Sequence, residues 1–230
     1  TMVDEGDMVL VPDPCYPVFG DGPQIAGANL YYMPQKKENG YMIRLDEIPE
    51  DVAEKAKLMV VSYPNNPTTA MAPDSFYEEL IAFASRHDII VLHDNAYSDL
   101  VFDGRTCGSF LGFPGAKEVG VEFNSLSKTY GLAGARIGFC LGNEAVVSRI
   151  KLLKSNMDYG MFLPIQAAAI AAITGDQSCV HTTMKAYETR RNIMCDGFTG
   201  IGWKMERPAA TMFVWAGIPG KFKSSEEFVM

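Results

Sequence analysis

Short, nearly continuous runs of apolar residues recur along this chain, and segments with helical periodicity separate most of them. Six of these runs read as buried strands: Met8–Val11, Leu30–Met33, Leu58–Ser62, Ile89–His93, Val119–Phe123 and Ile137–Leu141. Continuous hydrophobicity is typical of strands covered on both faces, as in a parallel sheet. Because strands alternate with helices, the pattern predicts an α/β fold with a doubly wound, mostly parallel sheet.

Two of the intervening segments carry clear helix signals. Residues Asp74–His87 begin with a possible capping box, in which Ser75 pairs with Glu78. The apolar face expected for this helix comprises Phe76, Leu80, Phe83 and Ala84. Asn143 is expected to cap a second helix. The residues that this second helix should turn inward are Val146, Val147, Ile150 and Leu153.

The pattern changes after Gly160. Leu163–Ile173 is rich in alanine and predicts a helix, and a longer helix should follow and end near Gly200 and Gly202. Its apolar stripe, which Arg191 interrupts, consists of Val180, Met184, Tyr187, Met194 and Phe198. Thr211–Ala216 predicts another strand. We interpret residues 1–175 as a large domain and residues 176–230 as a connecting helix with the beginning of a smaller α/β domain.

Composition narrows the classes of protein to consider. The 230 residues are 47% hydrophobic and 21% charged, which is enough apolar material for a sizeable core. The formal net charge is −8, and no basic stripe indicates nucleic-acid binding. The longest apolar runs, such as Ile165–Ile173, are too short to cross a bilayer. We therefore expect neither a nucleic acid nor a membrane as partner.

The cysteines and the first residues bear on the compartment. The chain has five cysteines, an odd number, and they lack the spacing of metal ligands, as do its three histidines. We therefore expect reduced thiols and no metal site. Thr1–Asp7 is acidic and polar, unlike a signal peptide. These features favour a cytoplasmic protein.

Chemically capable side chains follow four of the predicted strands. Ligands of open α/β sheets bind beyond the carboxyl ends of the strands, so these segments should meet at one edge of the sheet. They run Pro12-Asp-Pro-Cys-Tyr-Pro17, Tyr63-Pro-Asn-Asn-Pro-Thr68, Asp94-Asn-Ala-Tyr97 and Asn124-Ser-Leu-Ser-Lys-Thr-Tyr-Gly131, and Arg136 follows the last of them. One edge would thus present aromatic rings, amides, a carboxylate, a lysine and hydroxyls.

Three of these segments, the last of them extended to Gly138, resemble the signatures of the class I/II, fold type I, pyridoxal-phosphate-dependent aminotransferases. They occur in the order and at the approximate spacing of that family, and the similarity extends from about Asp4 to about Ala216. The resemblance implies a cofactor-binding large domain within residues 1–175. It also implies pyridoxal 5'-phosphate as cofactor and transfer of an amino group from an amino acid to a 2-oxo acid.

By this resemblance Lys128 is the Schiff-base lysine, and it also moves the α-proton of the substrate. Asp94 pairs with the pyridine nitrogen of the cofactor, because a nearby carboxylate keeps that nitrogen protonated. The alternatives are a solvated surface lysine and an aspartate that caps a helix or turn. Strand alternation turns His93 away from Asp94, which predicts a packed histidine.

The resemblance assigns the other cofactor contacts too. Asn66 and Tyr97 donate to the phenolic oxygen of the ring, and Arg136 pairs with the phosphate through its planar fork. The hydroxyls of Ser125 and Ser127 bind the phosphate, and the ring of Tyr16 stacks on the cofactor ring. An Asn-Pro turn, a core tyrosine and a surface arginine are the structural alternatives for the first three, and core packing is the alternative for Tyr16.

The chain departs from the family in length. Members carry an upstream glycine-rich turn for the phosphate and a downstream arginine for the substrate carboxylate, and neither segment is found here. We therefore expect a partial sequence that has little activity alone and exposes apolar surface at its sheet. The family also has glycine where this chain has Thr69, so the turn geometry there should differ.

Three functions remain open at this point. The first is an aminotransferase, with loops that resemble the branch containing LL-diaminopimelate, alanine and aspartate aminotransferases. The second is a carbon–sulfur β-lyase of the same fold, which uses the same cofactor contacts. The third is the cofactor-binding effector domain of a transcriptional regulator, which the acidic charge does not support. The resemblance also implies a homodimer.

Overall fold

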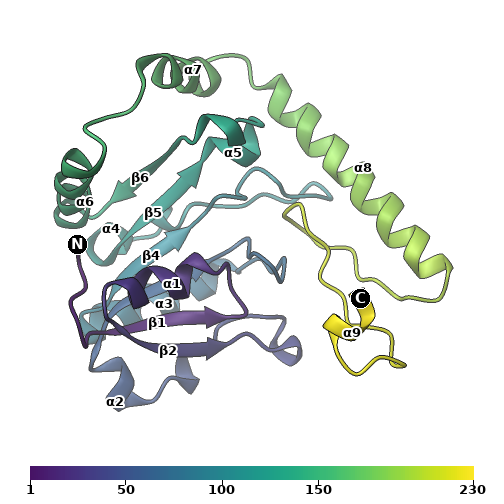
Figure 1. The fold of residues 1–230 in the computed structure, drawn as a ribbon, viewed down its shortest axis with the longest axis horizontal. Helices are drawn as coiled ribbons and strands as arrows, with labels where there is room; N and C mark the ends of the chain where they lie inside the picture. Colours follow the sequence, from purple (N-terminus) through teal and green to yellow (C-terminus); the bar gives the residue numbers. More distant parts are fainter.

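The computed structural model describes all residues, 1–230, and contains one six-stranded sheet (Figure 1). Its strands are β1 (Met8–Asp13), β2 (Asn29–Pro34), β3 (Ala56–Ser62), β4 (Ile90–Asp94), β5 (Gly120–Ser125) and β6 (Gly138–Gly142), in the order β2-β1-β3-β4-β5-β6. All six apolar runs therefore form strands, and the predicted fold class is confirmed. Three predicted strand starts were one residue early, because Ile89 and Ile137 precede β4 and β6, and Val119 belongs to a helix.

The helices lie mainly between and after the strands. They are α1 (Val18–Ile25), α2 (Glu50–Ala53), α3 (Asp74–His87), α4 (Ala116–Val119), α5 (Leu126–Thr129), α6 (Glu144–Met157), α7 (Leu163–Thr174), α8 (Ser178–Gly200) and α9 (Ser225–Val229). None of them is long and apolar enough to span a membrane.

Five strands run parallel, and β6 pairs with β5 in the antiparallel direction. The segment between β5 and β6 contains only the single turn of α5 and a 3₁₀ turn at Ala133–Ala135. A parallel return requires a crossover, usually a helix long enough to pass over the sheet. The connection contains no such helix, and the chain returns beside β5 from the same edge.

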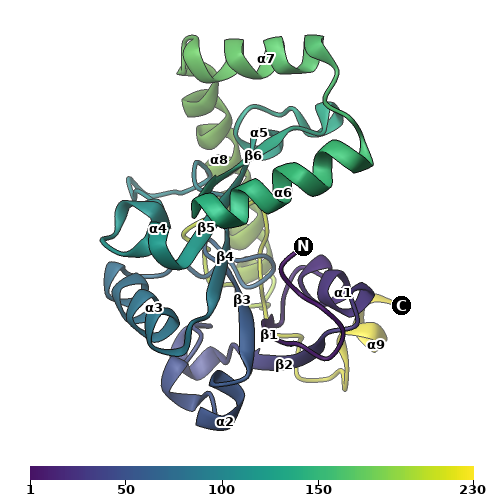
Figure 2. The same ribbon diagram turned by 90° about the vertical axis from the view of Figure 1, so that its left-hand side faces the viewer.

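Helices cover the two faces of the sheet unequally (Figure 2). The face beneath α3 and α4 holds the main core of 18 buried residues, with Tyr63, Phe76 and Phe110 among the largest. On the other face, α1 packs against β1 and β2, and the core there is a cluster of Val9, Val11 and Leu58. The α1 face of β3, β4 and β5 is thus only partly covered.

The best-predicted helix, α3, has the predicted bounds but not the predicted cap. Its N-cap residue is Pro73, which offers no side-chain hydrogen bond, so the expected capping box of Ser75 and Glu78 is wrong. The helix begins with Asp74, which leaves Ser75 inside the first turn. Its buried face contains Phe76, Leu80 and Ala84 as predicted, together with Tyr77 and Ile81, while Phe83 is only partly buried.

Helix α6 begins as predicted, because Asn143 Oδ1 accepts hydrogen bonds from the backbone N–H groups of Ala145 and Val146 at 3.1 and 3.2 Å. Val146 is buried, whereas Leu153, predicted to face inward, is 46% exposed. The contacts of α6 are with β5 and β6, and from Lys151 its residues are exposed through the end of the helix. The apolar pattern therefore continues beyond the part of α6 that packs on the sheet.

The long helix α8 lies on the side toward which the parallel strands point (Figure 1). It ends at Gly200 as predicted, and its buried residues are Arg191 and Cys195 rather than the predicted apolar stripe. The strand predicted at Thr211–Ala216 is absent, and Ala210 makes an isolated bridge with Val101 instead. The predicted domain boundary falls in the turn between α7 and α8, and the two-domain division stays a prediction.

Candidate active site

The carboxyl ends of β1, β3, β4 and β5 share one edge of the sheet because these strands are parallel. Asp94 is the last residue of β4, and its Cα partners are Ser62 on β3 and Phe123 on β5. Asn66 follows β3 and Lys128 follows β5. Antiparallel β6 starts at the same edge, with Gly138 opposite Ser125, so Arg136 reaches this edge too.

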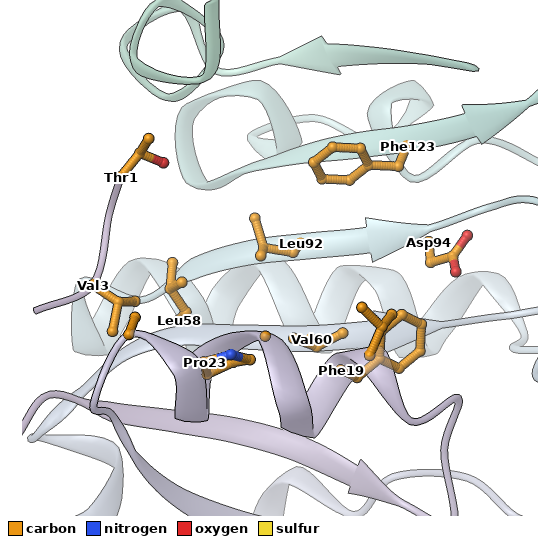
Figure 3. A pocket seen from close by; sticks show the side chains of 12 residues that line it. Thr1, Val3, Phe19, Pro23, Leu58, Val60, Leu92, Asp94 and Phe123 are labelled. Carbon is orange, nitrogen blue, oxygen red and sulfur yellow. The ribbon is translucent and has the colours of Figure 1, made fainter. Parts of the chain in front are cut away.

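A groove leads to Asp94 along the partly covered face of the sheet (Figure 3). Phe19 from α1 and Phe123 from β5 line it near the Asp94 carboxylate, and Val60 and Leu92 form part of its floor. At its other end the groove reaches Thr1 and Val3. An ionisable group thus stands at the end of a mainly apolar cavity of about 410 Å³, a volume in the range of small-molecule sites.

The Asp94 carboxylate is poorly solvated. Burial raises its pKa, and the N–H of Ala96, which donates to Asp94 Oδ1 at 3.0 Å, and the nearby His93 oppose that shift. A carboxylate in such a position gains from any cation that enters the groove beside it, because the cation stabilises the charged form. Asp94 is therefore suited to hold a protonated ring nitrogen.

Tyr97 is a buried phenol that is influenced by predicted site residues from the loops after β1, β3 and β4. Its side chain is 6% exposed. Burial raises the pKa of Tyr97 to about 12, with further contributions from Asp94 and Tyr16, and the Asn66 side chain acts in the opposite direction. Tyr16, Asn66 and Asp94 therefore all lie within electrostatic range of the Tyr97 hydroxyl.

Lys128 lies in α5, the single helical turn that follows β5. The Ser125 hydroxyl caps this turn by accepting a hydrogen bond from the N–H of Ser127 at 3.1 Å. Lys128 is partly buried, and its amine makes no ion pair or hydrogen bond within the chain. The two serines predicted to bind phosphate are therefore on the same turn as the lysine, and one of them also shapes it.

Arg136 is exposed and has a left-handed backbone conformation, with φ of 54°. Its Nη1 donates to the carbonyl of Ala133 at 3.1 Å, and no carboxylate pairs with it. The guanidinium thus keeps most of its donors for an anion. Arg136 and Lys128 thus lie at the same edge of the sheet, one near each end of the connection between β5 and β6.

His93 faces away from the groove, as predicted. It is fully buried, and its Nδ1 lies 3.2 Å from Glu122 Oε2 while its ring packs against Tyr77 and Phe110. No three histidine, cysteine, aspartate or glutamate side chains lie close enough together to hold a metal ion. All five cysteines are free.

Two aromatic residues near the site were not predicted from the sequence. Phe123 points into the groove, because successive side chains of a strand point to opposite faces and Glu122 points to the other one. The position of Phe123 in an apolar run was the signal that could have identified it. Phe213 packs edge-on against Tyr97 with ring centroids 5.7 Å apart. No local pattern could have identified Phe213, since it arrives from a distant, irregular segment.

Comparisons with known proteins agree with this geometry. The family described as aminotransferase class I and II matches residues 1–229. An LL-diaminopimelate aminotransferase of Moorella thermoacetica is 47% identical over 223 residues, which are 97% of this chain and 57% of that protein. One from Gloeobacter violaceus is 47% identical over 227 residues, or 99% of this chain and 58% of that protein. The chain thus spans little more than half the length of these relatives.

Solved structures give the same result. A substrate-bound structure of BacF from Bacillus subtilis superposes with a TM-score of 0.95 and 41% identity over 99% of this chain and 58% of that one. A probable N-succinyldiaminopimelate aminotransferase from Thermus thermophilus gives 0.90 and 32% over 96% of this chain and 59% of that one. Members of the matched family use pyridoxal phosphate. The chain belongs to the class I and II aminotransferases.

Proposed function

We propose that this chain is the cofactor-binding part of an enzyme that moves an amino group from an amino acid to a 2-oxo acid. The observation that carries the proposal is the position of Asp94, whose part-buried carboxylate ends an apolar groove between the loops of Asn66 and Lys128. The chain covers 57% and 58% of its relatives named above, so the activity of the whole protein is part of the proposal.

The Asp94 carboxylate suits the ring nitrogen of pyridoxal phosphate, and of the residues proposed to bind this cofactor it is the one that lines the groove. The pKa of Asp94 is raised by burial, and its carboxylate lies among apolar side chains. A protonated ring nitrogen would give this carboxylate a positively charged partner. When bound, this cofactor supplies an aldehyde that takes up amino groups and a ring that accepts electrons.

Lys128 is the proposed anchor, which holds the cofactor as a Schiff base. Because its amine has no partner within the chain, it is free for a covalent bond and for carrying a proton to and from the substrate α-carbon. Tyr97 and Asn66 are proposed to donate to the phenolic oxygen of the ring. The high pKa of Tyr97 keeps its hydroxyl protonated, as a donor must be.

The phosphate is proposed to bind where α5 and the start of β6 meet. Arg136 supplies a guanidinium that no carboxylate of this chain neutralises. Ser125 and Ser127 add hydroxyls from the lysine turn. Tyr16, which is 49% exposed at the same edge, is proposed to stack on the ring.

The amino donor is proposed from the relatives. Two relatives named LL-diaminopimelate aminotransferase are 47% identical to this chain, so a diaminopimelate is the first amino donor to test. We further propose a homodimer, as the resemblance implies, and a cytoplasmic location, with which the five free thiols agree. The β-lyase and regulator alternatives gain no support from the names of these relatives.

A paired assay tests the function. The full-length protein with pyridoxal phosphate is incubated with LL-diaminopimelate and 2-oxoglutarate, and glutamate is measured; a second reaction with cystathionine is assayed for pyruvate and ammonia. The proposal expects glutamate in the first reaction at a rate at least ~100-fold above that of the Lys128→Ala variant. Pyruvate and ammonia without glutamate would favour the lyase instead.

A further inference from the structure

The turn that carries Lys128 has few internal constraints. Helix α5 is four residues long, and only Leu126 and Thr129 of these are buried. The Lys128 amine has no polar partner, so contacts of its neighbours must set the direction of its side chain. Leu126 packs inward with 2% exposure, which fixes one side of the turn.

Thr129 fixes the other side through a hydrogen bond to a distant loop. Its hydroxyl donates to Asp99 Oδ2 at 2.8 Å, and Thr129 is 6% exposed. No other side chain of α5 hydrogen-bonds to another segment. Asp99 follows β4 in the same loop as Tyr97, shortly after Asp94. This bond therefore joins the lysine turn to the loop that carries the carboxylate and the phenol.

Tyr130, the residue after Thr129, makes a second hydrogen bond to a distant segment. The Tyr130 hydroxyl donates to Gln177 Oε1 at 2.8 Å, and Gln177 Nε2 donates to the carbonyls of Ala172 and Gly175 at 3.0 and 2.8 Å. Asp99 also contributes to the raised pKa of Tyr130, after burial, so it faces this part of the turn too. The lysine turn is thus tethered between the β4 loop and the start of α8.

From this geometry we infer that Asp99, through the Thr129 hydroxyl, is a positioning residue for Lys128. Successive side chains of a helical turn project about 100° apart, so fixing Thr129 also fixes the direction of Lys128. The bond itself contributes only about 1 kcal/mol to stability. Misplacing a reacting group by about 1 Å, however, can cost a rate factor of about 100. The inference rests on the proposed function of Lys128.

The test uses the full-length protein loaded with pyridoxal phosphate and four variants: Thr129→Val, Thr129→Ser, Asp99→Ala and the Thr129→Val/Asp99→Ala double variant. Valine keeps the shape of threonine and removes the hydroxyl, whereas serine keeps the donor. The measurements are kcat, the pH midpoint of the absorbance band of the lysine-bound cofactor, and the thermal unfolding temperature.

We expect Thr129→Val and Asp99→Ala each to lower kcat about 10-fold and to move the pH midpoint by about half a unit or more. The double variant should be no worse than either single one, because both remove the same bond. Thr129→Ser should retain kcat and the midpoint within about twofold and about 0.2 units. A merely structural bond would lower the unfolding temperature and leave the midpoint unchanged.

Two results would overturn the inference: a Thr129→Val variant with unchanged kcat and midpoint, or effects that multiply to about 100-fold in the double variant. Should Asp99→Ala fail to fold, the Thr129→Val and Thr129→Ser pair decides alone. Lys128→Ala separates this inference from the proposed function. A band that survives Lys128→Ala refutes the anchor itself, whereas a band lost there but unaffected by Thr129→Val refutes only the positioning role.

Discussion

Arg191 in α8 binds Asp103, 88 residues earlier in the chain, through two hydrogen bonds of 2.8 and 2.7 Å. Its Nη1 also donates to the carbonyl of Pro208 at 2.8 Å, and its guanidinium lies 4.8 Å from the centre of the Phe102 ring. The Arg191 side chain is only 4% exposed. An arginine in the middle of the predicted apolar stripe thus joins α8 to the segment that follows β4.

Replacing Arg191 by alanine should lower the free energy of unfolding of the full-length protein by about 2 kcal/mol, measured by urea denaturation. The loss combines packing on Phe102 with the bonds to Asp103 and Pro208, and it is below that of a fully buried pair because the Asp103 side chain is 53% exposed. Arg190, which is exposed, is the control, and Arg190→Ala should cost less than about 0.5 kcal/mol. Equal losses for both variants would contradict this account.

Glu122 should make stability depend on pH. Burial favours its neutral form, but hydrogen bonds from His93 and Asn124 prevail and lower its pKa to about 2. Because this pKa lies below the ordinary 4.5, its contribution is complete above pH 4.5 and is lost as the pH falls toward 2. Unfolding free energies measured from pH 6 to 3 should therefore fall more steeply for the native protein than for Glu122→Gln.

At neutral pH, Glu122→Gln should cost about 3 kcal/mol, since it replaces a buried carboxylate that accepts hydrogen bonds from the Ser109 hydroxyl and the Phe110 N–H, and an amide cannot accept all of them. Glu118→Gln, at an exposed position, is the matched control and should change stability by less than about 0.5 kcal/mol. If the two variants have parallel pH profiles, Glu122 does not carry the effect.

Asp94→Asn should reduce kcat by about 100-fold or more while the cofactor remains attached to Lys128. The amide keeps the shape but removes the charge that would hold the ring nitrogen protonated. Steady-state rates and the absorbance of the bound cofactor separate the two effects. Asp99→Asn is not a suitable control, because Asp99 is itself inferred to act on the site; Asp88→Asn, at the end of α3, should leave kcat unchanged. A kcat within about twofold of the native value in Asp94→Asn would refute the role of the carboxylate.

Gly138→Ala should disturb the pairing of β6 with β5 next to the lysine turn. A Cβ at this position would lie 2.5 Å from the carbonyl oxygen of Asn124, which is backbone and cannot rotate away. We expect a loss of about 1–3 kcal/mol in unfolding free energy. A Cβ at Gly134 would meet no atom within 4 Å, so Gly134→Ala is the control. Equal stability of the two variants would show that β6 adapts.

The sheet was predictable because its strands are nearly continuous in apolar residues, and the loops of the site could be located because parallel strands end at one edge. The antiparallel direction of β6 was not predicted, since an apolar run has no direction; the lack of a long helix between β5 and β6 was the available signal. Thr211–Ala216 has the composition of a strand but has no neighbouring strand to pair with in the described structure.

Polar partners far apart in sequence were the least predictable features. Glu122 interrupts an apolar strand, and its partners Ser109 and Phe110 lie in a loop without periodicity. Arg191 and Asp103, and likewise Thr129 and Asp99, are joined only once the chain has folded. The local motifs were enough to name candidate site residues, whereas the contacts that hold those residues in place could not be predicted from them.

The most direct measurement is the absorbance spectrum of the full-length protein with pyridoxal phosphate, compared with Lys128→Ala and with Lys117→Ala as an exposed-lysine control. The proposal predicts a band of lysine-bound cofactor in the native protein and in Lys117→Ala, discharged by an amino-acid donor, and no such band in Lys128→Ala. The same band in all three proteins, or in none of them, would contradict the assignment of Lys128 as the anchor.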